Sequence, residues 1–171
     1  MREVLACIVE NHPGVLSHMA GLFASRGYNI ESLTVGVTEG PRYSRVTIVC
    51  YGDEQILEQI RKQLGKLIDV IKVINLSSSE CVERELVLLK VNAPGSKRAE
   101  IMEITDVFRG KVVDIGQREL TIEVSGKQEK IEAFMDLMRT YGIKEVARTG
   151  VVAIARAQRY LVGKGGGPKS D

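Results

Sequence analysis

The chain has 171 residues, of which 44% are hydrophobic and 27% are charged, and its formal net charge is +2. This composition is typical of a soluble globular protein with one ordinary domain or two small ones. Basic and acidic residues alternate, which argues against a nucleic-acid-binding or membrane-surface protein. The sequence predicts no secretory signal, no apolar run near the roughly 20 residues of a membrane span and no paired cysteines, so we expect a cytoplasmic protein.

The N-terminal part of the chain predicts the order β-α-β-β-α-β. Residues 1–9 are typical of a strand, residues 33–37 and 46–50 alternate like two strands around a turn, and residues 69–76 predict a last strand. Asp53 is a plausible N-cap of the second helix. This order is that of the ferredoxin-like split βαβ motif, with both helices on one sheet face. The apolar positions of the two predicted helices are Leu16, Met19, Ala20 and Phe23, then Ile56, Ile60, Leu64 and Leu67.

Two of these strands, "LACIV" and "VTIVCY", are apolar on both faces. Cys7 and Cys50 lie within them, where a cysteine most often acts as a small buried hydrophobe. A sheet of such strands needs a cover on its second face as well as on the helical one. We therefore expect another subunit to cover the second face, in a homodimer built through this domain.

After "SSSECVERE" the same order recurs with little sequence identity. The expected strands are "RELVLLKVN", "KVVDI", "LTIEV" and the region "IKEVARTGVVAIAR", and the break "APGSKR" precedes the third helix. The apolar positions of the third and fourth helices are Ile101, Ile104 and Phe108, then Ile131, Phe134, Met135 and Met138. We predict an α+β protein with two ferredoxin-like βαββαβ domains in tandem, at residues 1–78 and 79–160.

The glycine-rich end of the chain, "GKGGGPKSD", cannot bury a core, and residues 161–171 are expected to form a flexible tail. It resembles the phosphate loop G-x-x-x-x-G-K-[ST] only superficially, because Pro168 occupies the sixth position and no strand-loop-helix frame follows. We expect no nucleotide site there.

The stretch "NHPGVL" separates the first predicted strand from the first helix and has the features of an anion site. Pro13 suits a first helical turn, since its missing N–H would be unpaired there, and Gly14 lets a ligand approach the backbone closely. The free amides of that turn and the helix dipole favour a carboxylate. Asn11 and Asn29 add polar groups at the end of one strand and the start of the next. A capped turn with two surface asparagines is the alternative that the pattern leaves open.

The sequence offers little that could catalyse a reaction. His12 and His18 are the only histidines, and because they are six residues apart across a predicted helix start they do not share a face as a metal-binding pair would. The RNA recognition motif shares the βαββαβ order, but it stacks bases on strand aromatics, whereas the aromatic content here is 5% and tryptophan is absent. A binding role without chemistry is favoured over an enzyme or an RNA-binding protein.

The segment "ENHPGVLSHMAGLFASRGYNIESLTV" resembles the opening of the ACT domain, a small-molecule-binding module of βαββαβ order. Together with "GDEQILEQIRKQLGKLIDVIKV", "VERELVLLKV", "FRGKVVDI" and "ARTGVVAIAR", it resembles the regulatory (small) subunit family of acetolactate synthase over roughly residues 1–160. The resemblance implies an ACT domain followed by a second ferredoxin-like domain. It also implies a non-catalytic protein of branched-chain amino-acid biosynthesis, which binds and activates the large catalytic subunit and confers feedback inhibition, usually by valine.

In such proteins the effector site lies where two ACT domains pair, and the family's effector residues match Asn11, Gly14 and Asn29. The resemblance places the valine carboxylate at the amides of residues 14–16 and its isopropyl group against apolar side chains such as Val15, Leu16 or Ile30. The residues so implied in effector binding are Asn11, Pro13, Gly14, Val15, Leu16, Asn29 and Ile30. No cofactor is expected on this chain, whereas thiamine diphosphate, Mg and FAD are expected on the catalytic partner. The alternative is a stand-alone amino-acid-sensing ACT protein that acts on a different partner.

Overall fold

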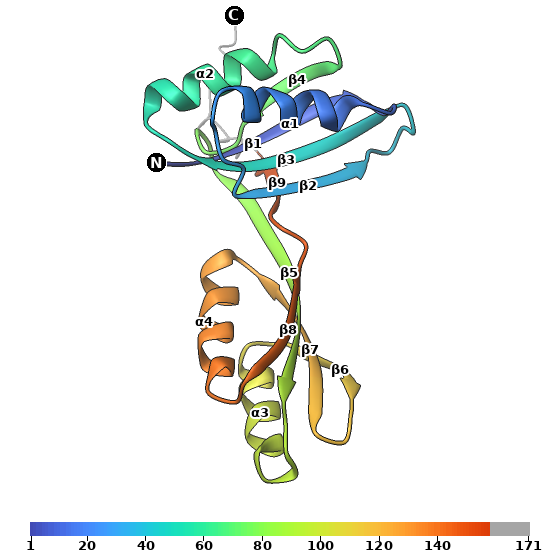
Figure 1. Cartoon of the computed structure of the whole chain (residues 1–171), viewed down its shortest axis with the longest axis vertical. Coiled ribbons are helices and arrows are strands. Elements are labelled where there is room, and N and C mark those ends of the chain that lie inside the picture. The colour runs from blue at the N-terminus through green and yellow to red at the C-terminus, as the bar shows by residue number, and fades with distance from the viewer. Residues whose placement is uncertain (158–171) are drawn as a thin grey trace, which may run out of the picture.

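A computed structural model describes residues 1–157, in which two α+β domains follow one another along the chain (Figure 1). The N-terminal domain comprises β1 (Arg2–Glu10), α1 (Val15–Ser25), β2 (Ser32–Val37), β3 (Tyr43–Tyr51), α2 (Glu54–Leu64) and β4 (Val70–Asn75). The C-terminal half comprises β5 (Cys81–Asn92), α3 (Gly95–Val107), β6 (Lys111–Ile115), β7 (Glu119–Gly126), α4 (Gln128–Arg139), β8 (Ile143–Arg148) and β9 (Val152–Ala155). The tail predicted at residues 161–171 lies outside the described residues.

The two main sheets have the same strand order. In the N-terminal domain the antiparallel order is β2-β3-β1-β4, and in the C-terminal domain it is β6-β7-β5-β8. Each domain carries its two helices on one face of its sheet (Figure 1). The predicted tandem of ferredoxin-like βαββαβ folds is therefore confirmed.

The helices of the N-terminal domain follow the sequence pattern with one correction. α2 has the predicted cap, because Asp53 Oδ1 accepts a backbone N–H of the first turn at 2.8 Å. α1 buries Val15, Met19 and Phe23, whereas Leu16 is 43% exposed. The apolar stripe of α1 therefore begins at Val15 and not at Leu16. The residues that face the sheet are four positions apart, starting from the first residue of the helix.

The hydrophobic cores confirm other sequence predictions. The apolar stripe of α4 packs against the second sheet, where Ile131, Phe134 and Met138 are fully buried. Cys7 and Cys50 are free and buried in the first core, and burial raises the pKa of their thiols to about 12 and about 11. These cysteines act as small buried hydrophobes, as predicted.

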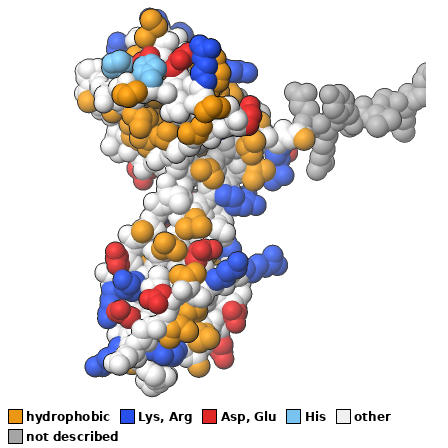
Figure 2. All heavy atoms as spheres, turned by 90° about the vertical axis from the view of Figure 1, so that its right-hand side faces the viewer, with side chains coloured by type: hydrophobic (Ala, Val, Ile, Leu, Met, Phe, Trp, Pro, Cys, Tyr) orange, Lys and Arg blue, Asp and Glu red, His pale blue; other side chains and the backbone are white. Residues whose placement is uncertain are grey.

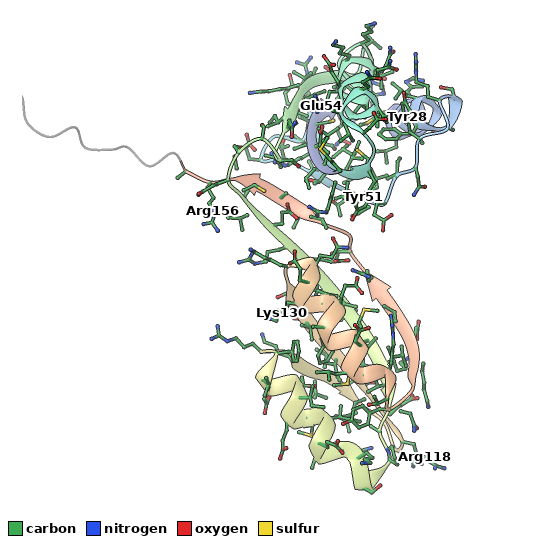
Figure 3. The ribbon with its side chains drawn as sticks, turned by 90° about the vertical axis from the view of Figure 1, so that its left-hand side faces the viewer. Tyr28, Tyr51, Glu54, Arg118, Lys130 and Arg156 are labelled. Carbon is green, nitrogen blue, oxygen red and sulfur yellow. The ribbon has the colours of Figure 1, made fainter. Side chains whose placement is uncertain are left out.

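β5 takes part in both halves of the molecule. Residues 81–84 pair with β9, and residues 85–92 pair with β7 and β8. The single final strand region predicted from the sequence is therefore two strands, β8 and β9, with Gly150 between them at a φ of +80°. A Cβ on Gly150 would lie 2.6 Å from Ser32 Oγ of β2, so only glycine fits without strain. Figure 3 shows β9 running beneath the N-terminal domain, with Arg156 at its end.

The segment around β9 covers part of the second face of the first sheet. Val151 and Ala153 pack against Val4, Ala6 and Val49 in a small separate core. The expectation that another subunit covers this face is therefore wrong for this strip, because the chain itself folds back from the second domain and buries it.

Hydrogen bonds fasten the same segment to β2 and β3. Thr34 Oγ1 donates to the Val151 carbonyl at 2.9 Å, and the Val151 N–H donates to Ser32 Oγ at 2.8 Å. Arg45 Nη2 donates to the Ala153 carbonyl at 2.7 Å. A fragment that ends near residue 78 would lose these bonds and expose the strip, so the two domains depend on each other at this face.

Candidate ligand-binding site

The loop between β1 and α1 leaves its backbone open to a ligand. Gly14 is the N-cap of α1 with a φ of +95°, and nothing lies within 4 Å of the position that a Cβ would take. The first intrahelical bond runs from the His18 N–H to the Gly14 carbonyl at 3.0 Å, so the N–H groups of residues 15–17 have no partner within the helix. Together with the helix dipole they can bind a carboxylate. Pro13 precedes the cap and is not the first-turn residue that we expected, because Gly14 turns the chain before the helix begins.

Asn11 fixes the start of this loop. Its backbone N–H donates to the Arg42 carbonyl at 2.8 Å, and its Nδ2 donates to the Pro41 carbonyl at 2.9 Å. Both acceptors lie in the turn between β2 and β3. The Asn11 Oδ1 can still accept a hydrogen bond from a ligand ammonium group. The side chain therefore positions the loop and keeps a polar atom for a ligand.

The apolar residues implied around the ligand differ in their access to it. Val15 is 4% exposed and belongs to the first core. Only its backbone N–H can reach a ligand, which corrects the expectation that its side chain faces the bound amino acid. Leu16 is exposed, and Ile30 is half-buried against the same core. These two side chains can offer apolar surface to a ligand.

Asn29 lies at the opposite end of α1 from Gly14. It is exposed in the connection between α1 and β2, and β2 begins only at Ser32, so Asn29 is not at the start of the strand as we expected. α1 has 11 residues, which corresponds to a length of about 16 Å. The loop around Gly14 and the pair Asn29 and Ile30 are therefore too far apart for one amino acid to contact both within a single chain.

Three side chains that sequence reasoning did not connect meet beside the loop. His12 Nε2 lies 2.9 Å from Asp69 Oδ1, and His18 Nδ1 lies 2.8 Å from Asp69 Oδ2. Asp69 belongs to the connection between α2 and β4, and its carbonyl accepts the Glu10 N–H at 2.9 Å. Figure 2 shows the two histidines side by side at the top of the N-terminal domain. No local pattern could have found this cluster, because the shared carboxylate is 57 and 51 positions away from the two histidines.

The cluster shifts the protonation of its members. The Pro13 carbonyl, 2.9 Å from His12 Nδ1, raises the pKa of His12 above its ordinary value, and the Asp69 carboxylate raises it further. Hydrogen bonds from His18 and His12 lower the pKa of Asp69 against the opposing effect of burial. The Asp69 side chain, 11% exposed, is thus an ionised carboxylate at neutral pH beneath two more exposed imidazoles.

Within residues 1–157, no group of three or more His, Cys, Asp or Glu side chains is arranged to hold a metal ion. No helix in this part of the chain is long and apolar enough to cross a membrane.

The fold and the helix-start loop define a class of protein, a tandem of ferredoxin-like domains that begins with an ACT domain. Residues 5–72 match the family described as "AHAS small subunit-like ACT domain". Residues 84–157 match the family described as "Small subunit of acetolactate synthase". The two matches together span both halves of the chain.

Individual relatives agree with these matches. The chain is 54% identical to a probable acetolactate synthase small subunit from Archaeoglobus fulgidus, over 93% of this chain and 99% of that protein. It is 46% identical to the acetolactate synthase small subunit from Haemophilus influenzae, over 95% and 100% of the two chains. It is also similar to the crystal structure of that small subunit from Thermotoga maritima, with a TM-score of 0.85, 40% identity and coverage of 92% and 99%. The chain belongs to the acetolactate synthase small-subunit family, and its role is that of a regulatory subunit in branched-chain amino-acid synthesis.

Proposed function

We propose that this chain binds and activates the large subunit of acetolactate synthase and confers feedback inhibition by valine bound where two ACT domains pair. Membership of the small-subunit family implies a catalytic large subunit as the partner and agrees with a non-catalytic role for this chain. Thiamine diphosphate, Mg and FAD belong to that partner in this proposal.

The observation that carries the dimeric site is the separation of the implied effector residues. Asn11 and Gly14 lie at the N-terminal end of α1, whereas Asn29 and Ile30 lie beyond its C-terminal end, about 16 Å away. A valine molecule is far shorter than this helix. A site that uses both ends therefore takes the loop from one chain and Asn29 from its partner.

Exposed apolar residues on β2 support the pairing of two such domains. β2 is an edge strand of the first sheet, and its outer edge pairs with no strand of residues 1–157. Leu33, Val35 and Val37 are exposed along it. Apolar side chains beside an open strand edge are typical of a surface that another chain covers. A homodimer formed there places Asn29, just before β2, at the interface.

Each chemical group of valine has a counterpart in this arrangement. The carboxylate meets the backbone amides of residues 14–16 at the positive end of α1. The ammonium group meets the amide oxygens of Asn11 and Asn29. The isopropyl group packs against Leu16 and Ile30, which are the implied apolar side chains with accessible surface.

Reconstitution with the large subunit tests the proposal. A tagged large subunit is co-purified with this chain and assayed for acetolactate formation with and without valine, leucine and isoleucine. We expect co-purification, more activity than the large subunit alone has, and the strongest inhibition by valine. A complex whose rate no branched-chain amino acid changes contradicts the feedback role. Failure to co-purify, with an amino acid still bound by the chain, favours the stand-alone sensor.

Light scattering tests the dimer separately. We expect a homodimer at micromolar concentration, because the open edge of β2 and its apolar residues need a cover. A monomer under the same conditions contradicts a site shared between two ACT domains.

A further inference from the structure

His12 lies between two hydrogen-bond acceptors in the loop that starts α1. Its Nδ1 is 2.9 Å from the Pro13 carbonyl oxygen, and its Nε2 is 2.9 Å from Asp69 Oδ1. A carbonyl and an ionised carboxylate can only accept hydrogen bonds. Both contacts are therefore satisfied together only when both ring nitrogens carry a proton, which is the imidazolium form.

Asp69 is held in place more firmly than the loop that carries His12. Its carbonyl accepts the Glu10 N–H of β1, its carboxylate also accepts a bond from His18, and its side chain is largely buried. The loop of residues 11–14, by contrast, is exposed along its length. The contact with His12 therefore ties an exposed loop to a fixed anchor on the connection between α2 and β4.

We propose that Asp69 positions the loop of residues 11–14 through His12, and that the loop binds the carboxylate of its effector more tightly when His12 is protonated. The inference rests on the proposed function, because it concerns the regulation of the same site. The imidazolium holds the carbonyl of Pro13, the residue just before Gly14, and adds positive charge beside the amides that receive the carboxylate. Loss of the proton removes one hydrogen bond and that charge together.

Of the other charged groups around His12, the nearby acid favours the same protonation state. Glu10 of β1 raises the pKa of His12. Arg42, in the turn between β2 and β3, is exposed and pairs with Glu10 at 3.7 Å. His18 of α1 faces Asp69 through its own Nδ1. Asp69→Asn therefore removes the carboxylate that is bonded directly to His12 and leaves Glu10 unchanged.

The direction of the effect follows from the raised pKa of His12. The bonds from the protonated His12 to the loop and to Asp69 are fully formed below the ordinary histidine pKa of about 6.5. They are lost as the pH rises through the higher pKa that His12 has in the folded protein. The affinity for valine should therefore fall about two- to fivefold between about pH 6 and about pH 8.5, the effect of one surface charge near a helix N-terminus.

NMR titration tests the positioning role without any effector. The full chain has two histidines, so a His18→Gln variant assigns both imidazole signals. We expect the His12 midpoint to lie above its ordinary value, to fall towards that value in Asp69→Asn, and to stay raised in His18→Gln. An Asp69→Asn protein that is folded by circular dichroism and keeps the wild-type midpoint overturns the positioning role. Should that variant unfold, Asp69→Glu, which keeps the charge but moves it, replaces it.

Calorimetry with valine tests the consequence for binding. The affinity of the wild type and of His18→Gln should decline over the pH range, whereas the affinity of His12→Gln should stay constant. A flat wild-type profile, or a slope that persists in His12→Gln, overturns the inference and leaves the proposed function standing. Absence of valine binding at every pH overturns the proposed function and the binding part of the inference with it, while the NMR midpoint still decides whether Asp69 controls His12.

Discussion

Two loops with the same four-letter pattern connect the first strand to the first helix in the two domains, "NHPG" at residues 11–14 and "NAPG" at residues 92–95. The sheets around them have the same strand order. The loops nevertheless differ in conformation. Gly14 has a φ of +95° and caps α1, whereas Pro94 caps α3 and Gly95 is its first helical residue.

Equivalent backbone bonds show that the two patterns are out of register by one residue. In the first domain the Asn11 N–H donates to the Arg42 carbonyl in the hairpin turn, and in the second domain the Ala93 N–H, not that of Asn92, donates to the Arg118 carbonyl. Asn11 and Ala93 are therefore the equivalent positions. Two residues lie between Asn11 and the cap of α1, whereas Ala93 is followed directly by the cap of α3. The additional length is what allows the first loop to turn outward.

A side chain closes the second loop. Arg98 Nη2 donates to the carbonyls of Ala93, Gly116 and Gln117 at 3.3, 2.8 and 2.9 Å. Four residues after the cap of α1 the corresponding residue is His18, which bonds Asp69 instead. The comparison teaches that the shared fold does not by itself make a ligand site. In the first domain, two additional residues and a glycine with positive φ open the loop that we propose as the ligand site.

The largest effect is expected from Gly14→Asp, which disrupts the first loop. The new carboxylate takes the place proposed for the ligand carboxylate, and the φ of +95° adds about 1 kcal/mol of strain. Valine affinity should fall by more than about a hundredfold, which corresponds to about 3 kcal/mol, while the large subunit is still activated. Calorimetry and valine inhibition of the reconstituted complex measure the two effects.

Gly95→Asp is the matched control for the second loop. Its φ is not positive, and nothing lies within 4 Å of its Cβ position, so this variant should fold and bind valine normally. Normal valine inhibition in the Gly14→Asp complex would mean that the first loop, like the second, is only a turn.

The next largest effect is expected from Gly150→Ala, where the chain returns from the second domain to the first. The φ of +80° and a Cβ placed 2.6 Å from Ser32 Oγ should together destabilise the protein by about 2 to 4 kcal/mol. Gly142→Ala has a similar φ of +93°, but its nearest neighbour, Asn92 Cβ, is 3.8 Å away, so about half that loss is expected. Thermal unfolding measures both, and equal losses would argue against close docking of β9 on the first sheet.

A smaller effect is expected from Arg98→Met, which opens the second loop. Three carbonyls lose a charged donor, and the free energy of unfolding should fall by about 1 to 2 kcal/mol. Arg118→Met is the control, because Arg118 follows Gln117 at the same end of the domain and is exposed (Figure 3). Calorimetry should still find one valine site per chain at most. A second site in Arg98→Met would show that closure by Arg98, and not loop length, separates the two loops.

The smallest effect is expected in the pH dependence of stability. The raised pKa of His12 contributes stability that is present below about pH 6.5 and is lost as the pH rises through the folded value. The lowered pKa of Asp69 contributes stability that is present above about pH 3.9 and is lost as the pH falls through the folded value. The difference in Tm between the wild type and Asp69→Asn should therefore peak between about pH 4 and about pH 6.5. A constant difference over the whole range would contradict the ion pair.

Much of the fold and part of the site are local properties of the sequence. The stripe of α4 and the cap at Asp53 depend only on residues within a few positions, so such local patterns predicted the βαββαβ order of both domains, although not the division of the last strand region into β8 and β9. The same holds for the break at Pro13 and Gly14, because unpaired amides at a helix start follow from where the helix begins. Asn29, by contrast, lies before β2 and not at its start, because the position where a strand begins depends on pairing with the neighbouring strand.

Contacts between distant segments were decided by the tertiary structure alone. Asp69 meets His12 across 57 positions, and Val151 meets Thr34 across 117. The apolar second face of the first sheet predicted that a cover exists, but not that β9 of the same chain supplies part of it. A repeated pattern such as N-x-P-G likewise contains no information about its register on the sheet. The periodicity of a sequence records which side of an element is apolar, whereas only the packing of the whole chain decides what lies against that side.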